Sequence, residues 1–266
     1  ITLGERLVGA ALFAPVTLSR LLPYRWRVPV AGWLTARVLA PLAGYGKRIR
    51  RNLALTHPDL PEAEMRRIVR AVCDNSGRNL VELFSPEFIA RAQQASVEGP
   101  SLAPAQTALA EGRPIILVSG HFGSFNAARA KVDSMGFVNA AFYRIMANRP
   151  FNARYVEEMA KVSGPIFEQS RSGVVQMVRH LRGGGVLAIL NDVNAHDGLP
   201  LDFFGHPALT SLSAAEMALK YDAPLVPVWA IRAENGLDFR VIFDEEIPHS
   251  DALTMKPMRL ALAWLR

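Results

Sequence analysis

Short apolar runs alternate with helical stretches from residue 115 onward, and this alternation constrains the fold more than any other feature. The runs cover residues 115–119, 139–143, 165–169, 186–191, 225–231 and 239–244, and helices are expected near 125–135, 151–163, 172–182 and 211–221. Strands that are apolar throughout and separated by helices are typical of a largely parallel sheet with both faces covered. The expected fold class is therefore α/β, with a mostly parallel central sheet flanked by helices.

The N-terminal part of the chain has a different character. Residues 7–19 and 30–43 are apolar, but each run is shorter than the roughly 20 residues that cross a hydrocarbon layer, and Pro15 interrupts the first. Interfacial helices are expected, with ordinary core-packing helices as the alternative. Residues 61–84 have helical apolar spacing, and residues 86–104 are interpreted as a polar connection. We expect a membrane-associating region over 1–60 and an α/β domain over 61–266.

Charge supports an anionic partner for the N-terminal region. The chain of 266 residues has a formal charge of +6. Residues 20–52 contain eight Lys or Arg and no Asp or Glu, and they are interleaved with aliphatic and aromatic residues. This mixture favours a membrane surface over nucleic acid. The chain lacks an initial Met and stops in the apolar run "LALAWLR", so a truncated C-terminus is expected.

Several other features have simple structural interpretations. A single cysteine, Cys73, excludes an intrachain disulfide and lies at helical spacing with apolar neighbours, as a buried residue would. The "RGGG" run at 182–185 precedes a strand, so it is interpreted as a helix-to-strand turn and not as a phosphate loop. "NDVNAHD" with His206 lacks the spacing of metal ligands, and no metal is expected.

The candidate chemistry lies in "PIILVSGHFGSFNAARA". His121 directly follows the first apolar run, and ligands of open α/β sheets bind beyond the carboxyl ends of the strands. Asn126 can face His121 only if the histidine is on a loop and Asn126 is in the first helical turn, a freedom that Gly120 and Gly123 supply. Such a pair suits a general base, whereas the alternative is a histidine that only caps the helix or packs.

This turn resembles the His-x4-Asp/Glu motif of the glycerolipid acyltransferase superfamily. The chain is most similar to the lipid A late acyltransferases, the lauroyl and myristoyl transferases and their relatives. The similarity extends through "RIRRNLALTHPDLPEAE", "GRPIILVSGHFGSFN", "YRIMANRPFN", "GGGVLAILND" and "LDFFGHPALTSLSAAEMALKYDAPLVPVWAIR". It implies transfer of a fatty acyl group from an acyl carrier protein or coenzyme A thioester to a hydroxyl of a bacterial membrane lipid, at the cytoplasmic face of the inner membrane.

The resemblance also implies roles for particular residues. His121 would deprotonate the acceptor hydroxyl, with no acyl-enzyme and no bound cofactor. Arg144 would contact a phosphate or the thioester region, its alternative being a surface salt bridge. Asp192 would organise the acceptor or position the arginine, its alternative being a carboxylate that only caps a loop. Weaker candidates for substrate contacts are Phe122, Gly123, Asn148, Arg149 and Phe204.

Asn126 departs from the family pattern, which has Asp or Glu at this position. An amide can orient a histidine but offers no opposing charge to an imidazolium. Three explanations stay open: a natural variant that uses another acid, an engineered inactive substitution, or a relative that binds lipid or acyl carrier without catalysis.

Overall fold

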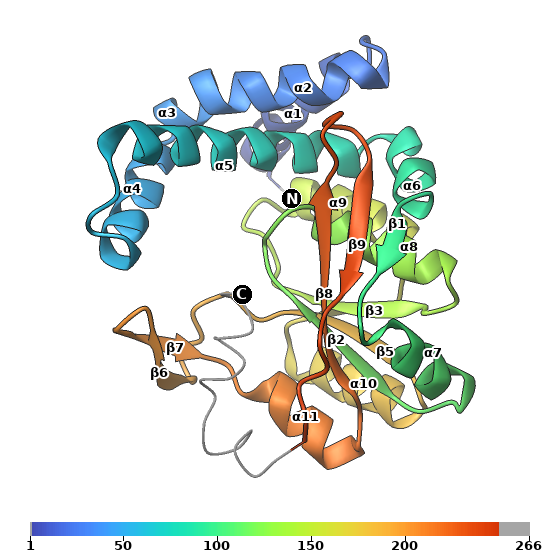
Figure 1. Cartoon of the computed structure of the whole chain (residues 1–266). Helices are drawn as coiled ribbons and strands as arrows, with labels where there is room; N and C mark the ends of the chain where they lie inside the picture. Colours follow the sequence, from blue (N-terminus) through green and yellow to red (C-terminus); the bar gives the residue numbers. More distant parts are fainter. Residues whose placement is uncertain (1, 250–266) are drawn as a thin grey trace. The chain divides into compact units, whose positions relative to one another are not determined.

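A computed structural model describes residues 2–249, and the C-terminal run "LALAWLR" lies outside this range. Two compact units are distinguished by their internal contacts. One contains the N-terminal helices up to Phe88 and the three residues Phe204–His206, and the other begins at Ile89 and contains the main sheet (Figure 1). The expected boundary near residue 60 stays a prediction. The helix over 61–84, which forms as expected, packs within the first unit.

The second unit is built on a seven-stranded sheet in the order β1-β9-β8-β2-β5-β3-β4. The strands are β1 (Ser96–Glu98), β2 (Ile115–Ser119), β3 (Asn139–Tyr143), β4 (Ile166–Glu168), β5 (Val186–Leu190), β8 (Leu225–Arg232) and β9 (Phe239–Phe243). All pairs are parallel except β8 with β9. The mostly parallel α/β class expected from the sequence is confirmed.

Helices cover this sheet because its strands are apolar on both sides. The helices are α6 (Pro86–Gln93), α7 (Leu102–Ala110), α8 (Phe125–Ser134), α9 (Arg149–Val162), α10 (Arg171–Arg182) and α11 (Ser213–Tyr221). Apolar residues of α10 and α11 join those of β2, β5 and β8 in one buried cluster, whereas α8 contacts β3, β8 and β9 and packs against α9. Leu187 and Leu225 of this cluster are fully buried.

The structure corrects the sequence interpretation in two places. The polar connection expected over 86–104 contains helix α6, strand β1 and the start of α7. A separate hairpin, β6 (Leu199–Phe203) with β7 (His206–Thr210), was not expected, because its residues lack a strong apolar run and are mostly exposed. The "RGGG" run does form the turn between α10 and β5, as predicted.

The first unit is helical. It contains α1 (Leu3–Ser19), α2 (Tyr24–Leu34), the π-helix η1 (Thr35–Leu39), α3 (Ala40–Leu42), α4 (Tyr45–Thr56) and α5 (Glu62–Leu83). Glycines allow α2 and η1 to approach α5 closely: a Cβ at Gly77 would overlap Thr35, and one at Gly32 would overlap Asp74. Cys73 of α5 is buried, as the helical spacing predicted.

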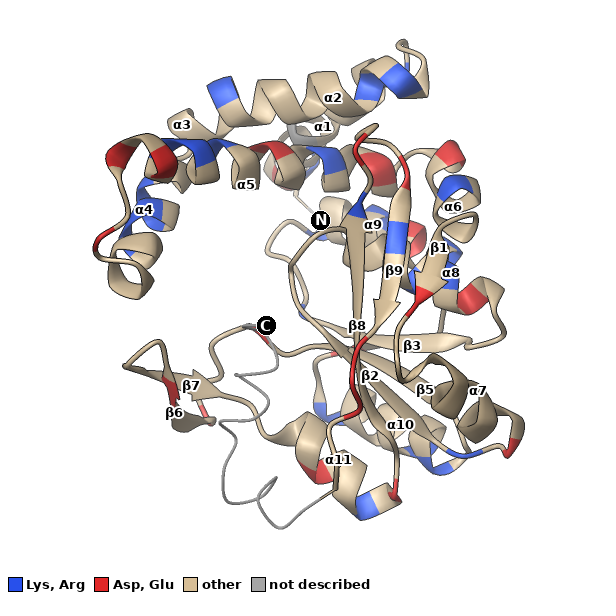
Figure 2. Ribbon diagram, viewed as in Figure 1, with Lys and Arg blue, Asp and Glu red and all other residues tan. Residues whose placement is uncertain are grey.

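A buried arginine ties the start of α2 to the rest of this unit. Arg27 donates to the carbonyl of Leu22 at 3.1 Å, to Ser85 Oγ at 3.0 Å and to Glu87 at 3.2 Å. None of the helices formed by residues 2–249 has the length and hydropathy of a membrane span. Figure 2 shows Lys and Arg distributed along the helices of this unit, with no acidic residue in α2, α3 or α4.

Candidate active site

Two adjacent parallel strands carry the candidate catalytic residues. In the register of β2 with β5, Ser119 pairs with Leu190. His121 follows Ser119 by two residues, and Asp192 follows Leu190 by two, so the two side chains leave the same edge of the sheet from neighbouring strands. The chain then runs from β2 past β5 to β3, and from β5 past β2 to β8. Adjacent strands whose connections run in opposite directions along the sheet open a ligand crevice at the carboxyl edge.

Asp192 contacts His121 with both carboxylate oxygens. Oδ1 lies 2.8 Å from Nδ1 of the imidazole, and Oδ2 accepts the backbone N–H of His121 at 2.7 Å. Since a carboxylate only accepts, the neutral imidazole carries its proton on Nδ1 and presents Nε2 as an acceptor. Within residues 2–249, no group hydrogen-bonds Nε2, so this nitrogen is available to take a proton from a substrate.

The pair tunes the ionisation of both groups. The hydrogen bond from Asp192 raises the pKa of His121, an effect that partial burial opposes and the carboxylate charge reinforces. Partial burial acts to raise the pKa of Asp192, but its hydrogen bonds with His121 and the attraction of the imidazole outweigh burial and lower that pKa. Asp192 therefore stays ionised, and His121 is a stronger base than an isolated histidine.

The Gly-His-Phe-Gly turn is held by close backbone contact with β8. Gly123 has φ +58°, and a Cβ there would overlap the carbonyl oxygen of Ala230. The backbone N–H of Ser124 donates to the same carbonyl at 3.0 Å. Phe122 is 58% exposed and sits edge-on to Trp229, and it does not line the cavity that contains His121. Gly123 thus has a structural reason to be glycine.

Asn126 does not orient His121. It is the second residue of α8, as expected, but its side chain is 95% buried, and its Oδ1 has no hydrogen-bond partner in the part of the chain described. The carboxylate beside His121 is supplied by Asp192, which is 71 residues away in the sequence. The position matches the expectation that Asn126 lies in the first turn, but the expected pairing with His121 is wrong.

A cavity of about 350 Å³ opens beside the His121 ring. Arg144 lines it together with Tyr143 and Gln169, and Arg144 Nε donates to Gln169 Oε1 at 3.1 Å. No carboxylate pairs with Arg144 among residues 2–249, so the surface salt bridge considered from the sequence is absent there. An exposed guanidinium without an ion pair, beside a candidate base, is suited to an anionic ligand.

The remaining sequence candidates have other positions. Asn148 caps α9, accepting the backbone N–H of Phe151 at 2.9 Å, and Arg149 is the exposed first residue of that helix. Phe204 belongs by its contacts to the first unit, where its ring centroid lies 5.3 Å from that of His57. Neither Asn148, Arg149 nor Phe204 lines the cavity beside His121.

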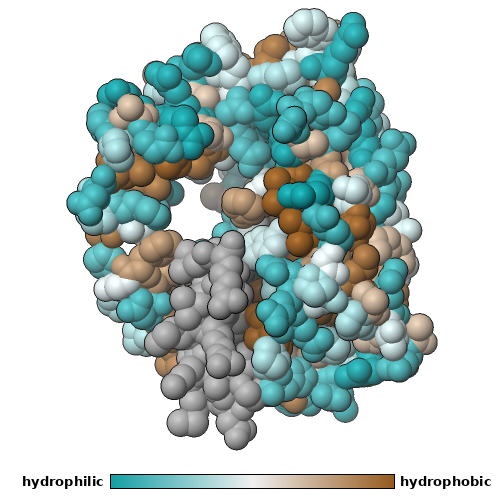
Figure 3. Space-filling view, in the orientation of Figure 1, coloured by the Kyte–Doolittle hydropathy of each residue, from teal (hydrophilic) through white to brown (hydrophobic). Residues whose placement is uncertain are grey.

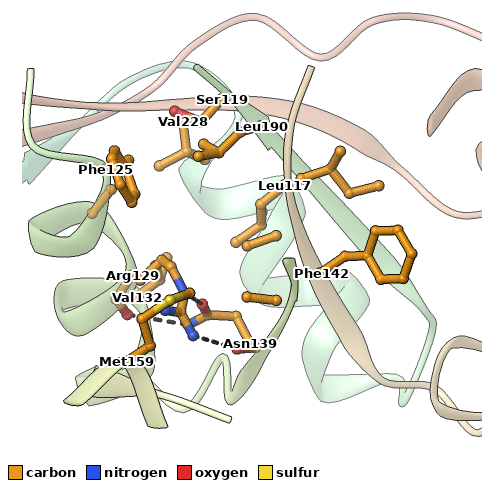
Figure 4. Close-up of a pocket in the computed structure, with 14 residues that line it drawn as sticks. Leu117, Ser119, Phe125, Arg129, Val132, Asn139, Phe142, Met159, Leu190 and Val228 are labelled. Atoms are coloured by element: carbon orange, nitrogen blue, oxygen red, sulfur yellow. Dashed lines mark hydrogen bonds between the residues drawn. The ribbon is translucent and has the colours of Figure 1, made fainter. Parts of the chain in front are cut away.

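Sequence reasoning missed a second, mostly apolar cavity of about 60 Å³ in the core. It shares Phe125, Phe142, Met159 and Leu190 with the wall of the His121 cavity. Figure 4 shows Arg129 in its wall, bonded to Asn139, with Met159 and Val132 nearby. Burial lowers the pKa of Arg129 to about 10, and Arg129 Nη1 lacks a hydrogen-bond partner within residues 2–249. The one signal in the sequence is the helical spacing of apolar residues around Arg129, which indicates a cation that faces the core.

Among residues 2–249, no three His, Cys, Asp or Glu side chains gather as a metal site requires. The site contains a histidine–aspartate pair at the carboxyl edge of an α/β sheet, with an arginine and apolar side chains in the cavity beside it. Such a pair can accept a proton from a bound group.

The family comparison names the class. Residues 7–255 match the family model of bacterial lipid A biosynthesis acyltransferases. The chain therefore belongs to this family, and it is an acyltransferase. A search of curated proteins finds no match to the chain.

Proposed function

We propose that the chain is a membrane-associated O-acyltransferase that moves a fatty acyl group from an acyl carrier protein or coenzyme A thioester to a hydroxyl of a bacterial membrane lipid. The observation that carries the proposal is the bidentate contact of Asp192 with His121 in a member of this family. The acceptor is a lipid A precursor or a lyso-lipid such as a lyso-aminolipid.

In the proposed reaction, Nε2 of His121 takes the proton of the acceptor hydroxyl. At the same time the hydroxyl oxygen attacks the carbonyl carbon of the thioester. The tetrahedral intermediate collapses, the C–S bond breaks, and the departing thiolate takes the proton back from the imidazolium. The products are an ester and a free thiol. Asp192 supports this step by holding the proton on Nδ1 and by stabilising the imidazolium that forms.

Arg144 and the two cavities would bind different parts of the acyl donor. The guanidinium of Arg144 would hold a phosphate of the donor, since phosphate oxygens match its donor geometry. The acyl chain would run past Phe142 and Met159 from the larger cavity toward the smaller one, whose lining is almost entirely apolar. Met159 is flexible and polarisable, which suits a boundary that opens when a chain enters.

We propose membrane association because the charged and aromatic surface of the N-terminal region is complementary to a bilayer surface. The acid-free basic segment over residues 20–52 would face anionic headgroups, and the exposed Trp26 and Trp33 suit the interfacial region of a bilayer. The cytoplasmic face of the inner membrane is where acyl carrier protein and coenzyme A thioesters are available.

The competing function is a relative that binds lipid or acyl carrier without catalysis, which Asn126 suggested. Asp192 removes the main reason for it, because the histidine already has a carboxylate partner. The natural-variant explanation for Asn126 is therefore the one that the geometry supports.

The test is acyl transfer by the full chain, with radiolabelled acyl-carrier-protein and acyl-coenzyme A donors and vesicles that contain the candidate acceptors. We expect an ester product with the wild type and a loss of about 100- to 10,000-fold with His121→Ala. The matched control is His180→Ala, a histidine of α10 that does not line the His121 cavity. Equal rates for the wild type and His121→Ala would sink the proposed mechanism.

A further inference from the structure

The first unit contains a large apolar groove that the proposed reaction does not use. Its volume is about 630 Å³, and side chains of α1, α2, η1 and α5 line it. Ala14 and Leu22 contribute from the α1 side, Ala31 and Thr35 from α2 and η1, and Leu80 from α5. Apart from Thr35 and Ser19, the lining side chains are aliphatic, proline or glycine, so water in this groove gains few hydrogen bonds.

A π-helix forms part of this wall. Thr35 and Leu39, the first and last residues of η1, both line the groove. The extra residue in a π-turn interrupts the regular α-helical surface, and such turns are frequent at functional sites. Gly77 of α5, also in the lining, lets η1 approach α5, because a Cβ there would overlap Thr35.

Three arginines of the helices that form the groove have no carboxylate partner within residues 2–249. Arg20 and Arg25 flank the turn that carries Leu22, whereas Arg37 lies in η1, beyond the opposite end of α2. Arg20 donates to the carbonyl of Phe84, and Arg37 lies over the ring of Trp33, but none of the three forms an ion pair among residues 2–249. Four carboxylates of this unit, in contrast, are paired with other arginines: Glu62 with Arg50 and Arg66, Glu64 with Arg67, Asp74 with Arg78, and Glu87 with Arg27.

Apolar surface also continues beyond the groove. Leu18 and Leu21 near the end of α1, and Trp26 and Trp33 of α2, are between 50% and 81% exposed. Figure 3 shows hydrophobic residues at the molecular surface among the hydrophilic ones. An amphipathic ligand with an acyl tail and a negative headgroup satisfies both the groove and the neighbouring arginines, whereas a purely polar or purely apolar ligand satisfies only one of them.

We infer that this groove binds one acyl chain of an anionic membrane phospholipid, with the phosphate near Arg20 and Arg25 at the turn between α1 and α2. The bound lipid is neither donor nor acceptor in the proposed reaction. It would anchor the N-terminal helices to a single lipid molecule, in addition to any general attraction to the bilayer. The inference does not depend on His121 or on catalysis.

The experiment uses the full chain and short-chain phosphatidylglycerols below their micelle concentration, so that single lipid molecules are presented without a bilayer. Binding is followed by calorimetry. We expect one saturable site, and each methylene added to the chain that occupies the groove should tighten binding about fourfold. Phosphatidylcholine with the same chains should bind at least tenfold more weakly, since it carries no net negative charge.

Groove-filling variants test the location. Ala31→Phe places a ring in the groove and should weaken binding at least tenfold, as should the independent variant Ala14→Phe. Ala71→Phe is the matched control, because Ala71 is exposed on α5 and does not line the groove. Circular dichroism must show the same helix content in all three. Unchanged binding in both groove variants would overturn the inference, and so would equal affinity for phosphatidylcholine.

A different occupant would also be recognised. If the groove instead holds a second copy of the chain, sedimentation would show a dimer that Ala31→Phe dissociates. Added phosphatidylglycerol would then leave most of the protein dimeric. That result would overturn the inference as well. Loss of acyl transfer with His121→Ala, by contrast, should leave phosphatidylglycerol binding unchanged, so the two proposals fail independently.

Discussion

Asp192 binds His121 twice, through the backbone N–H at 2.7 Å and through the imidazole Nδ1 at 2.8 Å. The first contact fixes the loop after β2, and the second fixes the orientation of the ring. A single carboxylate therefore positions both the main chain and the side chain of the proposed base. Its removal should affect the rate more than the binding of substrates.

Asp192→Asn should lower kcat by about 100- to 10,000-fold with a smaller change in KM, because the amide neither fixes the tautomer nor stabilises the imidazolium. The pH profile should also change. The proposed mechanism requires neutral His121, so in the wild type kcat/KM should rise with pH through a pKa above the ordinary histidine value. In the variant this limb should move to lower pH, since the main cause of the raised pKa is gone. A limb at the same pH in both proteins would contradict the pairing.

Asn126→Asp should not increase the rate. The side chain is buried, and its Oδ1 already lacks a partner within residues 2–249, so a carboxylate there would be poorly solvated. Burial would raise the pKa of the new Asp above its unfolded value, so the folded state would bind the proton more tightly, and stability would fall as pH rises above that unfolded value. We expect a loss of roughly 1–3 kcal/mol at about pH 8 and less at about pH 5, measured by urea unfolding. A large gain in turnover would instead identify Asn126 as a disabled catalytic position.

Gly123→Ala should disrupt the turn that carries His121. The residue has φ +58°, and its added methyl would overlap the Ala230 carbonyl, so the loop must move away from β8. The matched control is Gly112→Ala, which has φ +68° but no atom within 4 Å of the added methyl. The control should cost about 1 kcal/mol from backbone strain alone, and Gly123→Ala at least twice as much, with loss of activity. Similar unfolding midpoints for the two variants would argue against a close-packed turn.

Arg144→Gln should raise KM for the anionic donor about tenfold, which corresponds to about 1.4 kcal/mol, with a smaller effect on kcat. The side chain lines the His121 cavity and has no carboxylate partner among residues 2–249, so its charge is available to a ligand. Salt should weaken donor binding in the wild type more than in the variant. The control is Arg149→Gln, an exposed residue that does not line this cavity. Equal effects of the two substitutions would show that Arg144 does not bind the donor.

Arg27→Met should destabilise the N-terminal helices by roughly 2–4 kcal/mol, because the carbonyl of Leu22 and the hydroxyl of Ser85 lose a buried donor. The ion pair with Glu87 adds little, since that carboxylate is 46% exposed. Arg25→Met is the control, because Arg25 is exposed and forms no ion pair in the described part of the chain, and it should change stability by less than about 0.5 kcal/mol. Urea unfolding followed by far-ultraviolet circular dichroism measures the difference.

Local sequence pattern was sufficient for most elements of the α/β fold. The apolar runs over 115–119, 139–143 and 225–231 became β2, β3 and β8, because buried parallel strands need apolar residues on both faces. The hairpin β6–β7 was not predictable in this way, since its exposed residues carry no periodic apolar signal. Strand β1, of three residues, is too short for any such signal.

For the site, the sequence by itself determined that His121 follows a buried strand, and the resemblance to a family pointed to its role. It could not determine the partner of His121, and the nearest polar candidate, Asn126, was the wrong one. Two residues five positions apart are related by local backbone geometry, and α8 turns Asn126 into the core. Asp192 reaches His121 only because β5 inserts beside β2 in the sheet, an order decided by tertiary packing and long-range strand pairing.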